Sequence, residues 1–387
     1  MDMRSPWILV LLLTSTTAEY LVPTPPGRYN VTLTTGPLID YARDDPYAAA
    51  PTPRALMLSV FQPSTCASTV SVPDMPSEVA DYQGPFLKQT FNISVNLSPL
   101  LLEAHLPVCP DPLKVSRCSH PSDSPILLFS PGYSIPRLYY NVLASAIASE
   151  GFTVITIDHP GDANIIIYPD GHAVYNNASI LDSPTWDTYT RAADASFVID
   201  QLSNATAMAE LLPQRGPRPF PTDRVAMLGH SAGGASAIIA ASRDPRIRGA
   251  INWDGTIFGS PPPPGLSEPV EVMSQPVLFL SHQDYAGPSW LSTWPRLEGP
   301  KLLLYIENTT HYTFSDMPTL LEAAGQGTAP FADLLGTIAP TRMVRILTTY
   351  TTAWMNAVFT GKVGEPLLEG EEPGRFPEVS ALMRGNF

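Results

Sequence analysis

The 387-residue sequence predicts an α/β fold, in which helices cover both faces of a mainly parallel sheet. From residue 124 onward, short apolar segments alternate with segments of helical periodicity. Several of the apolar segments lack polar alternation, which is typical of strands buried on both faces. With 44% hydrophobic and 15% charged residues, the chain can also bury a substantial core. Functional residues are therefore expected after the carboxyl ends of the strands.

Residues 1–18 are predicted to be a secretory signal peptide. Arg4 supplies a positive charge, residues 7–13 are apolar, and residues 16–18 are small enough for cleavage. The apolar run is too short to span a bilayer. Six Asn-x-Ser/Thr sequons agree with a secretory route and with an extracellular location. They begin at Asn30, Asn92, Asn96, Asn177, Asn204 and Asn308.

Residues 19–387 are predicted to form one domain. Within residues 19–123, apolar runs at 29–34 and 55–61 indicate strands that form an antiparallel edge of the sheet. The rest of that part is rich in proline, so we expect loops and one helix near residues 100–105.

The main part of the domain, residues 124–361, carries the alternating elements, and residues 362–387 form a C-terminal tail. The predicted strands are residues 126–130, 153–157, 225–228, 249–252, 277–280 and 302–306. The predicted helices are residues 138–150, 186–202, 235–241 and 341–359. On the second of these, Arg191 and Asp194 have the spacing of a surface ion pair with no catalytic role.

Three cysteines fit an oxidising compartment. Cys109 and Cys118 lie nine positions apart and could close a small ring, or Cys66 could pair with either of them. No spacing of cysteine and histidine indicates a zinc site.

The segment Gly229-His230-Ser231-Ala232-Gly233 reads G-x-S-x-G between a predicted strand and a predicted helix. In this context a sharp turn exposes the serine hydroxyl, and the glycines avoid collisions with neighbouring backbone. Ser231 is therefore predicted to be a nucleophile, although the same pattern also occurs in ordinary strand-to-helix turns.

A serine nucleophile needs a histidine to accept its proton and a carboxylate to orient that histidine. His311 follows the last core strand and is the predicted base. Asp254 and Asp284 follow two successive strands before it, and both could reach His311. The order Ser, Asp, His agrees with this architecture, but strand order alone leaves the acid open, with a slight preference for Asp284.

The formal net charge of −14 and the absence of a basic run argue against nucleic acid as a partner. No cofactor is expected for a Ser/His/Asp mechanism. The expected partner is a small ester, and no obligate protein partner is expected.

Across roughly residues 126–318, the chain resembles the α/β-hydrolases related to secreted platelet-activating-factor acetylhydrolase, and more distantly the cutinase-like polyester hydrolases. The matching segments are residues 129–133 (FSPGY), 143–158 (LASAIASEGFTVITID), 229–234 (GHSAGG), 253–255 (WDG) and 311–316 (HYTFSD). The acetylhydrolase group places the acid after the earlier strand, which matches Asp254, and the cutinase-like group matches Asp284. The combined segments are more similar to the first group, so the resemblance favours Asp254.

The resemblance also implies an oxyanion hole formed by the backbone N–H groups of Tyr133 and Ala232. The family more often has His-Gly where this chain has Pro131-Gly132. Tyr133 and Trp253 are expected to form an aromatic wall of the substrate pocket, unless Trp253 packs in the core.

These observations predict a secreted serine ester hydrolase with Ser231, Asp254 and His311 as its catalytic residues. The resemblance implies a phospholipid substrate, with a short sn-2 acyl group of a platelet-activating-factor-like phospholipid as the group that is cleaved. Such a substrate implies at most transient contact with a lipid surface. A cutinase-like or general carboxylesterase is the nearest alternative. A non-catalytic binding protein with a hydrolase fold is the alternative from another class.

Overall fold

The computed structural model describes residues 18–110, 124–177, 179–180, 184–215, 218–257, 270–362 and 364–386. The predicted signal peptide therefore lies almost entirely outside the described residues, as does Cys118. In the part of the chain that is described, no helix is long and apolar enough to cross a membrane.

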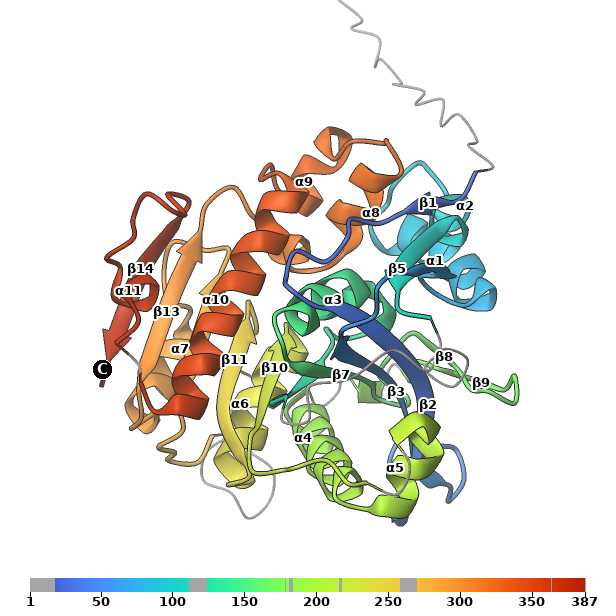
Figure 1. Cartoon of the computed structure of the whole chain (residues 1–387), viewed down its shortest axis with the longest axis horizontal. Coiled ribbons are helices and arrows are strands. Elements are labelled where there is room, and N and C mark those ends of the chain that lie inside the picture. Colours follow the sequence, from blue (N-terminus) through green and yellow to red (C-terminus); the bar gives the residue numbers. More distant parts are fainter. Residues whose placement is uncertain are drawn as a thin grey trace, which may run out of the picture.

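A nine-stranded sheet forms the centre of the molecule, in the order β14-β13-β12-β11-β10-β6-β7-β3-β2 (Figure 1). Its strands are β2 (Asn30–Asp44), β3 (Pro53–Ser64), β6 (Ile126–Ser130), β7 (Thr153–Asp158), β10 (Val225–His230), β11 (Ile247–Trp253), β12 (Val277–Ser281), β13 (Lys301–Ile306) and β14 (Val379–Gly385). The six strands from β13 to β7 in this order run parallel, as predicted. β2 and β3 form the predicted antiparallel edge beside β7.

The opposite edge differs from the prediction. The predicted tail contains β14, which pairs antiparallel with β13. Most residues of β14 are exposed or half-buried, so the sequence lacks the apolar signal that identified the central strands.

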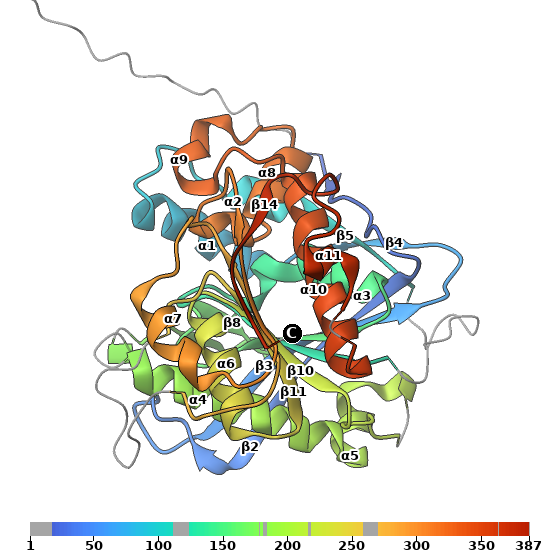
Figure 2. The same ribbon diagram turned by 90° about the vertical axis from the view of Figure 1, so that its left-hand side faces the viewer.

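Two layers of helices cover the sheet, as predicted. The helices are α1 (Ser77–Thr90), α2 (Ser98–Leu102), α3 (Asn141–Ser149), α4 (Pro184–Leu202), α5 (Ala205–Leu211), α6 (Ala232–Arg243), α7 (Pro288–Thr293), α8 (Met317–Ala323), α9 (Ala332–Leu335), α10 (Pro340–Thr360) and α11 (Pro366–Glu369). Figure 2 shows α3 and α10 on one side of the sheet, and α4, α6 and α7 on the other. Each layer closes its own hydrophobic core against the sheet, around Trp354 on one face and Ile238 on the other.

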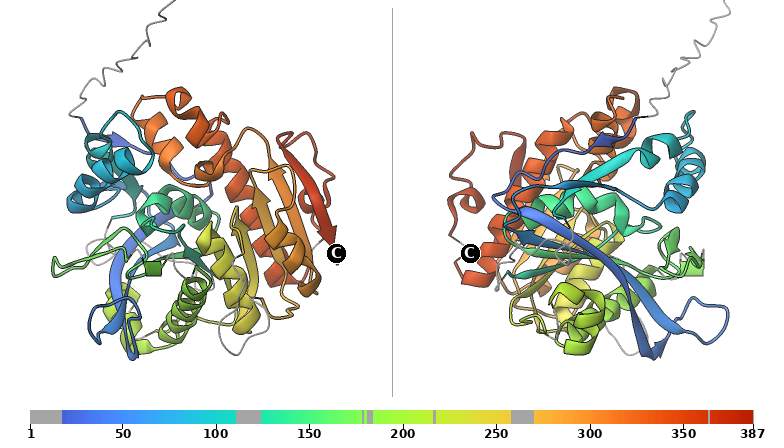
Figure 3. Two further views of the ribbon diagram at one scale, coloured as in Figure 1. Left: turned by 180° about the vertical axis from the view of Figure 1, so that it is seen from behind. Right: turned by 45° about the vertical axis from the view of Figure 1, so that its right-hand side comes forward.

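The N-terminal part adds a small three-stranded sheet in the order β1-β5-β4. Its strands are β1 (Tyr20–Leu21), β4 (Val70–Pro73) and β5 (Ala104–Val108). The expected helix near residues 100–105 is thus only partly right, because α2 ends at Leu102 and the chain continues as β5. Both views of Figure 3 place α1 and α2 at the same end of the molecule as α8 and α9.

One disulfide joins Cys66 to Cys109 across 43 sequence positions. It excludes the Cys109–Cys118 ring and selects one of the pairings that the sequence left open. The bridge connects the segment after β3 to the residue after β5, so it ties the small sheet to the edge of the large one. A third pair of strands, β8 (Ile165–Ile167) and β9 (Ala173–Tyr175), forms the hairpin around His172.

Candidate active site

The register of the central strands brings three loops together at one rim of the sheet. Gly229 pairs with Ser130, and His230 pairs with Trp253. Strands β6, β10 and β11 therefore end at nearly the same level, and the residues that follow them leave the sheet side by side. Ser231 and Asp254 are two of those residues.

Ser231 occupies the turn between β10 and α6 with φ at 55° and ψ at −123°, a conformation that L-residues rarely adopt. The flanking glycines make the turn feasible. A Cβ added to Gly229 would lie 2.1 Å from the carbonyl carbon of Gly233, and one added to Gly233 would lie 1.9 Å from the carbonyl oxygen of Ser130. The structure thus contains the strained serine turn that the G-x-S-x-G segment predicts.

A continuous hydrogen-bonded chain connects Ser231 to a carboxylate. The Oγ of Ser231 lies 3.0 Å from Nε2 of His311, and Nδ1 of His311 lies 2.5 Å from Oδ2 of Asp254. This pattern assigns the proton of neutral His311 to Nδ1, which leaves Nε2 free to accept the serine proton. Asp284, the other candidate, is exposed and makes no contact of this kind.

A second imidazole shares the carboxylate of Asp254. The Nδ1 of His282 lies 2.6 Å from the same Oδ2 atom, and the backbone N–H of His282 donates to Oδ1 at 3.1 Å. Burial alone would raise the pKa of Asp254, but the hydrogen bonds from His282 and His311 outweigh it and lower the pKa to about 2. Asp254 is therefore a carboxylate at neutral pH.

Asp254, His282 and His311 also lie close enough to be considered as a metal site, with candidate ligand atoms within 4.8 Å of one another. However, both Nδ1 atoms already point their N–H groups at the carboxylate. A metal ion would have to replace both hydrogen bonds and remove the Nδ1 proton of His311. The present arrangement fits proton transfer better than metal binding.

His230 connects the base to the loop after β6. Its Nε2 lies 3.0 Å from the backbone oxygen of His311, and its Nδ1 lies 2.8 Å from the hydroxyl of Tyr140. That hydroxyl in turn accepts the backbone N–H of Gly132 at 3.2 Å. Burial, followed by the charge of His311, lowers the pKa of His230 to about 3, so His230 remains neutral and can accept the Tyr140 proton.

Tyr133 and Ala232 occupy the positions expected of an oxyanion hole. The N–H of Ala232 is at the first position of α6, where backbone N–H groups have no intrahelical partner. On either side of Tyr133, the N–H groups of Gly132 and Ser134 are engaged by Tyr140 and Asp162. Neither the Tyr133 nor the Ala232 amide donates to a residue that the structure describes. Their role remains a prediction that this geometry supports.

The expected aromatic wall is not formed. Trp253 is completely buried and packs edge-on against Phe129, so the expectation that it contacts substrate is wrong and the core alternative holds. The side chain of Tyr133 points to Asn176, with its hydroxyl 3.3 Å from that amide oxygen. The strand alternation explains the Trp253 result, because Trp253 belongs to β11 and its ring faces the core layer of α3 and α10.

Two pockets of different polarity adjoin the serine turn. The first is polar and is lined by Ser231, Asp254, Thr256, His282, Gln283, Gly287, Ser289, Trp290 and His311. The second is almost entirely apolar and lies between the α1–α2 segment and the α8–α9 segment. His230 and Tyr312, the chain neighbours of Ser231 and His311, form part of its wall.

Several other buried residues serve the structure around the site. Asp158 accepts hydrogen bonds from the backbone and side chain of Arg137. Arg191 and Asp194 do not form a surface pair, because both are buried and each bonds to other residues. Asp194 pairs with Arg54, which is 140 positions away. Arg191 pairs with Asp162 outside the helix and with Asp187 one helical turn before it, so helical spacing could have indicated only the last of these partners.

Comparisons with known proteins agree with this geometry. Residues 127–372 match the model of the Alpha/beta hydrolase family. A probable 1-alkyl-2-acetylglycerophosphocholine esterase of Arthroderma benhamiae is 31% identical over 96% of this chain and 96% of its own. The platelet-activating factor acetylhydrolase of Bos taurus is 25% identical over 50% of this chain and 48% of its own.

Among solved structures, a ferulic acid esterase from Streptomyces cinnamoneus is similar with a TM-score of 0.73 and 25% identity, covering 95% of this chain and 100% of its own. The strand order, the serine turn and these similarities lead to one assignment. The chain belongs to the α/β-hydrolase family, in the group related to platelet-activating factor acetylhydrolase.

Proposed function

We propose that this protein is a serine ester hydrolase that works through an acyl-enzyme. The observation that carries the proposal is the chain from Ser231 through His311 to Asp254, with distances of 3.0 and 2.5 Å between the bonded atoms. It supplies a nucleophile, a base with a free Nε2, and a carboxylate that stabilises the imidazolium. A binding protein without catalysis would not need this alignment or the strained backbone of Ser231.

In the first half-reaction, Ser231 Oγ attacks the ester carbonyl carbon while its proton moves to Nε2 of His311. The carbonyl oxygen becomes an oxyanion, which accepts the N–H groups of Tyr133 and Ala232. His311 then returns the proton to the leaving alcohol as the C–O bond breaks. In the second half-reaction, water attacks the carbonyl carbon of the acyl-enzyme while its proton moves to Nε2 of His311. His311 then returns the proton to Oγ of Ser231 as the acyl bond breaks, which releases the acid.

The substrate class that we propose is a phospholipid with a short sn-2 acyl group, such as a 1-alkyl-2-acetylglycerophosphocholine. The full-length similarity to a probable esterase of that name supports it. The apolar pocket beside His230 and Tyr312 supports it too, because an alkyl chain needs an apolar surface next to the scissile ester.

The test compares the wild type with Ser231→Ala on a short-chain nitrophenyl ester and on 1-alkyl-2-acetylglycerophosphocholine. The wild type should hydrolyse both, and Ser231→Ala should hydrolyse neither. Full activity of Ser231→Ala would reject the mechanism. The substrate class would be wrong if a phospholipid with a long sn-2 acyl chain were cleaved as fast as the acetyl compound.

A general esterase that acts on aromatic acids is the second candidate, since the solved ferulic acid esterase is similar across nearly the whole chain. Methyl ferulate in the same assay separates the two. Preference for methyl ferulate over the acetyl phospholipid would favour this candidate.

We also infer that the protein is secreted. The disulfide between Cys66 and Cys109 supports an oxidising compartment. Expression of the full chain in a eukaryotic host should yield protein in the medium that begins near residue 19. Protein that stays inside the cell with residues 1–18 still attached would contradict the inference.

A further inference from the structure

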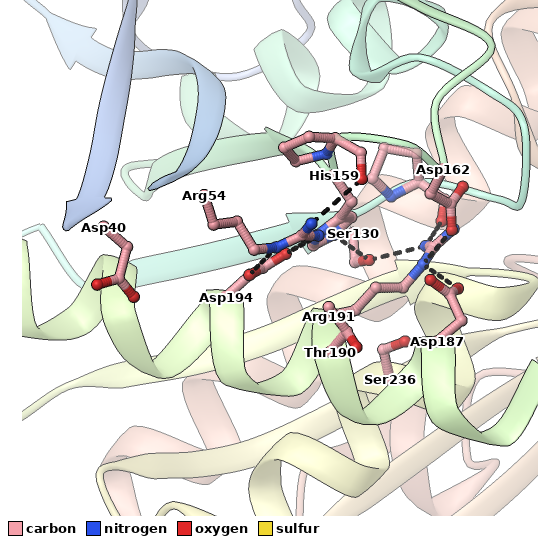
Figure 4. A network of polar contacts seen from close by, with 12 residues as sticks. Asp40, Arg54, Ser130, His159, Asp162, Asp187, Thr190, Arg191, Asp194 and Ser236 are labelled. Atoms are coloured by element: carbon pink, nitrogen blue, oxygen red, sulfur yellow. Dashed lines mark hydrogen bonds and ion pairs between the residues drawn. The ribbon is translucent and has the colours of Figure 1, made fainter. Parts of the chain in front are cut away.

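A buried network of charges joins helix α4 to β3 and to the loops after β6 and β7 (Figure 4). Two arginines with side-chain exposures of 0 and 1%, Arg54 and Arg191, meet carboxylates on α4 and on the loop after β7. Buried charges are costly unless they are paired and hydrogen-bonded, and these are. The contacts of Arg191 reach the loop of the proposed oxyanion hole.

Arg191 holds that loop through the carbonyl group of Pro131 and the hydroxyl of Ser130. Its Nη1 donates to the backbone oxygen of Pro131 at 2.6 Å and to Oγ of Ser130 at 3.2 Å. Its Nε donates to Asp162 at 2.8 Å and to Asp187 at 2.9 Å. Because the guanidinium is planar, these contacts fix its orientation as well as its position.

Asp162 holds the same loop through an N–H group. While one oxygen of its carboxylate pairs with Arg191, the other accepts the backbone N–H of Ser134 at 3.1 Å. Ser134 has φ at 58°, an unfavourable conformation for a serine, so its backbone needs such support. Arg191 and Asp162 therefore grip the loop on both sides of Tyr133.

Helix α6 closes the remaining side of the loop. A Cβ added to Gly233 would lie only 1.9 Å from the carbonyl oxygen of Ser130 and 2.5 Å from that of Pro131. The loop is thus confined between Arg191 and the first turn of the helix that carries Ala232. Small displacements of Arg191 would change the separation of the Tyr133 and Ala232 amides.

The network also contains Ser130, His159 and Asp194 in a Ser–His–Asp arrangement. Nε2 of His159 lies 2.9 Å from Oγ of Ser130, and Nδ1 lies 2.8 Å from Oδ2 of Asp194. All three are at most 2% exposed, and Ser130 also accepts from Arg191. No substrate can reach this serine, so the arrangement supports the end of β6.

We propose that Arg191 and Asp162 are positioning residues that set the Tyr133 amide in the oxyanion hole. This inference rests on the proposed ester hydrolysis. Arg191 and Asp162 should stabilise the transition state and contribute little to substrate binding, because the oxyanion forms only after attack by Ser231.

The experiment compares Arg191→Lys with Arg54→Lys. Both arginines are buried and both pair with carboxylates on α4, but Arg54 bonds to Asp194 and donates no hydrogen bond to residues 131–134. Each variant keeps the positive charge and loses the planar fork. The readouts are kcat, KM, the thermal unfolding midpoint, and the inhibition constant of a trifluoromethyl ketone, which forms an oxyanion on Ser231.

Removing one oxyanion donor lowers kcat about 100- to 1,000-fold, so displacing one should lower it about 10- to 100-fold in Arg191→Lys. KM should stay within about twofold, because ground-state binding is unchanged. The inhibition constant should rise by the same factor as kcat/KM falls. Arg54→Lys should lower the unfolding midpoint without changing kcat or the inhibition constant.

Asp162→Asn gives an independent second variant. It keeps an acceptor for Ser134 but loses the charge opposite Arg191, so we expect a smaller loss of kcat at constant KM. If Arg191→Lys does not fold, the kcat of Asp162→Asn tests the positioning role in its place, and a kcat equal to that of the wild type overturns it.

The positioning role is overturned if a folded Arg191→Lys retains the kcat and inhibition constant of the wild type. It is also overturned if Arg54→Lys loses kcat to the same extent, since the network would then act only through stability. If the wild type hydrolyses no ester, the proposed function itself fails, which is a different result from an active wild type with an indifferent Arg191.

Discussion

Replacing Asp254 with asparagine removes the charge that orients His311 and leaves the size of the side chain unchanged. In the wild type, Oδ2 of Asp254 accepts N–H groups from both His311 and His282. In the variant, one amide oxygen must serve two imidazoles, while the new NH₂ group donates. If it donates to Nδ1 of His311, the His311 proton moves to Nε2, which faces Ser231 and can no longer accept the serine proton.

The size of the effect follows from these contacts. Loss of the triad carboxylate lowers kcat about 10,000-fold in serine proteases, through the same change of tautomer. Here the amide oxygen can still bind His311 in part of the population, so we expect a decrease of about 1,000- to 10,000-fold, or about 4 to 5 kcal/mol in the activation barrier. KM should change little, because the side chain of Asp254 is only 4% exposed and acts on the reaction through His311.

The assay is hydrolysis of a short-chain nitrophenyl ester, with Asp284→Asn as the matched control. Asp284 is exposed, so its replacement should leave kcat within about twofold of the wild type, as is usual for surface changes. Asp254 is not the catalytic acid if Asp254→Asn keeps kcat within tenfold of the wild type while Asp284→Asn loses activity.

Further changes should separate the roles of hydroxyl, disulfide and charge. Tyr140→Phe leaves Nδ1 of His230 buried without a hydrogen-bond partner, so it should lower the free energy of unfolding by about 2 kcal/mol and also lower kcat. Urea titration and kinetics measure the two effects, and an unchanged unfolding midpoint would contradict the first. Replacing both Cys66 and Cys109 by alanine removes a disulfide that spans 43 sequence positions, which should lower the free energy of unfolding by about 4 kcal/mol and leave kcat unchanged. Equal stability of the oxidised and reduced wild type would contradict this. Because folding lowers the pKa of Asp254 from 3.8 to about 2, the ionised carboxylate should add about 2 kcal/mol to the free energy of unfolding above about pH 4. This stabilisation should be lost as the pH falls toward 2. The stability difference between wild type and Asp254→Asn should shrink over that interval, and a constant difference would show that the carboxylate is not the cause.

Ser231 and His311 could be predicted from the sequence because their signals are local. A buried strand, a glycine-bounded serine and a small-residue helix place Ser231 in a turn, and the segment after the last strand places His311 at the same rim. The acid could not be chosen from strand order, since Asp254 and Asp284 both follow apolar strands. The choice depends on a turn with φ at 56° at Asp254, which Asn252 stabilises by bonding to both backbone groups of Gly255.

The support around the site could not be predicted, because its partners are far apart in the chain. Arg54 meets Asp194 across 140 positions, and Arg191 meets Pro131 across 60. The sequence leaves open whether Trp253 contacts substrate or packs in the core. The structure decides for the core, because successive strand residues point to opposite faces and the ring of Trp253 is completely buried. Strand β14 lacked an apolar pattern because it lies at an edge and is only partly buried.

Labelling with a fluorophosphonate tests the central claim, that Ser231 is the nucleophile, most directly. The active protein is inhibited with the probe, digested, and the modified serine is located by mass spectrometry. We predict that one label per chain is found on Ser231, in proportion to the activity lost, and that Ser231→Ala takes up none. Complete inhibition with the label on Ser130 or on any other residue would contradict the assignment.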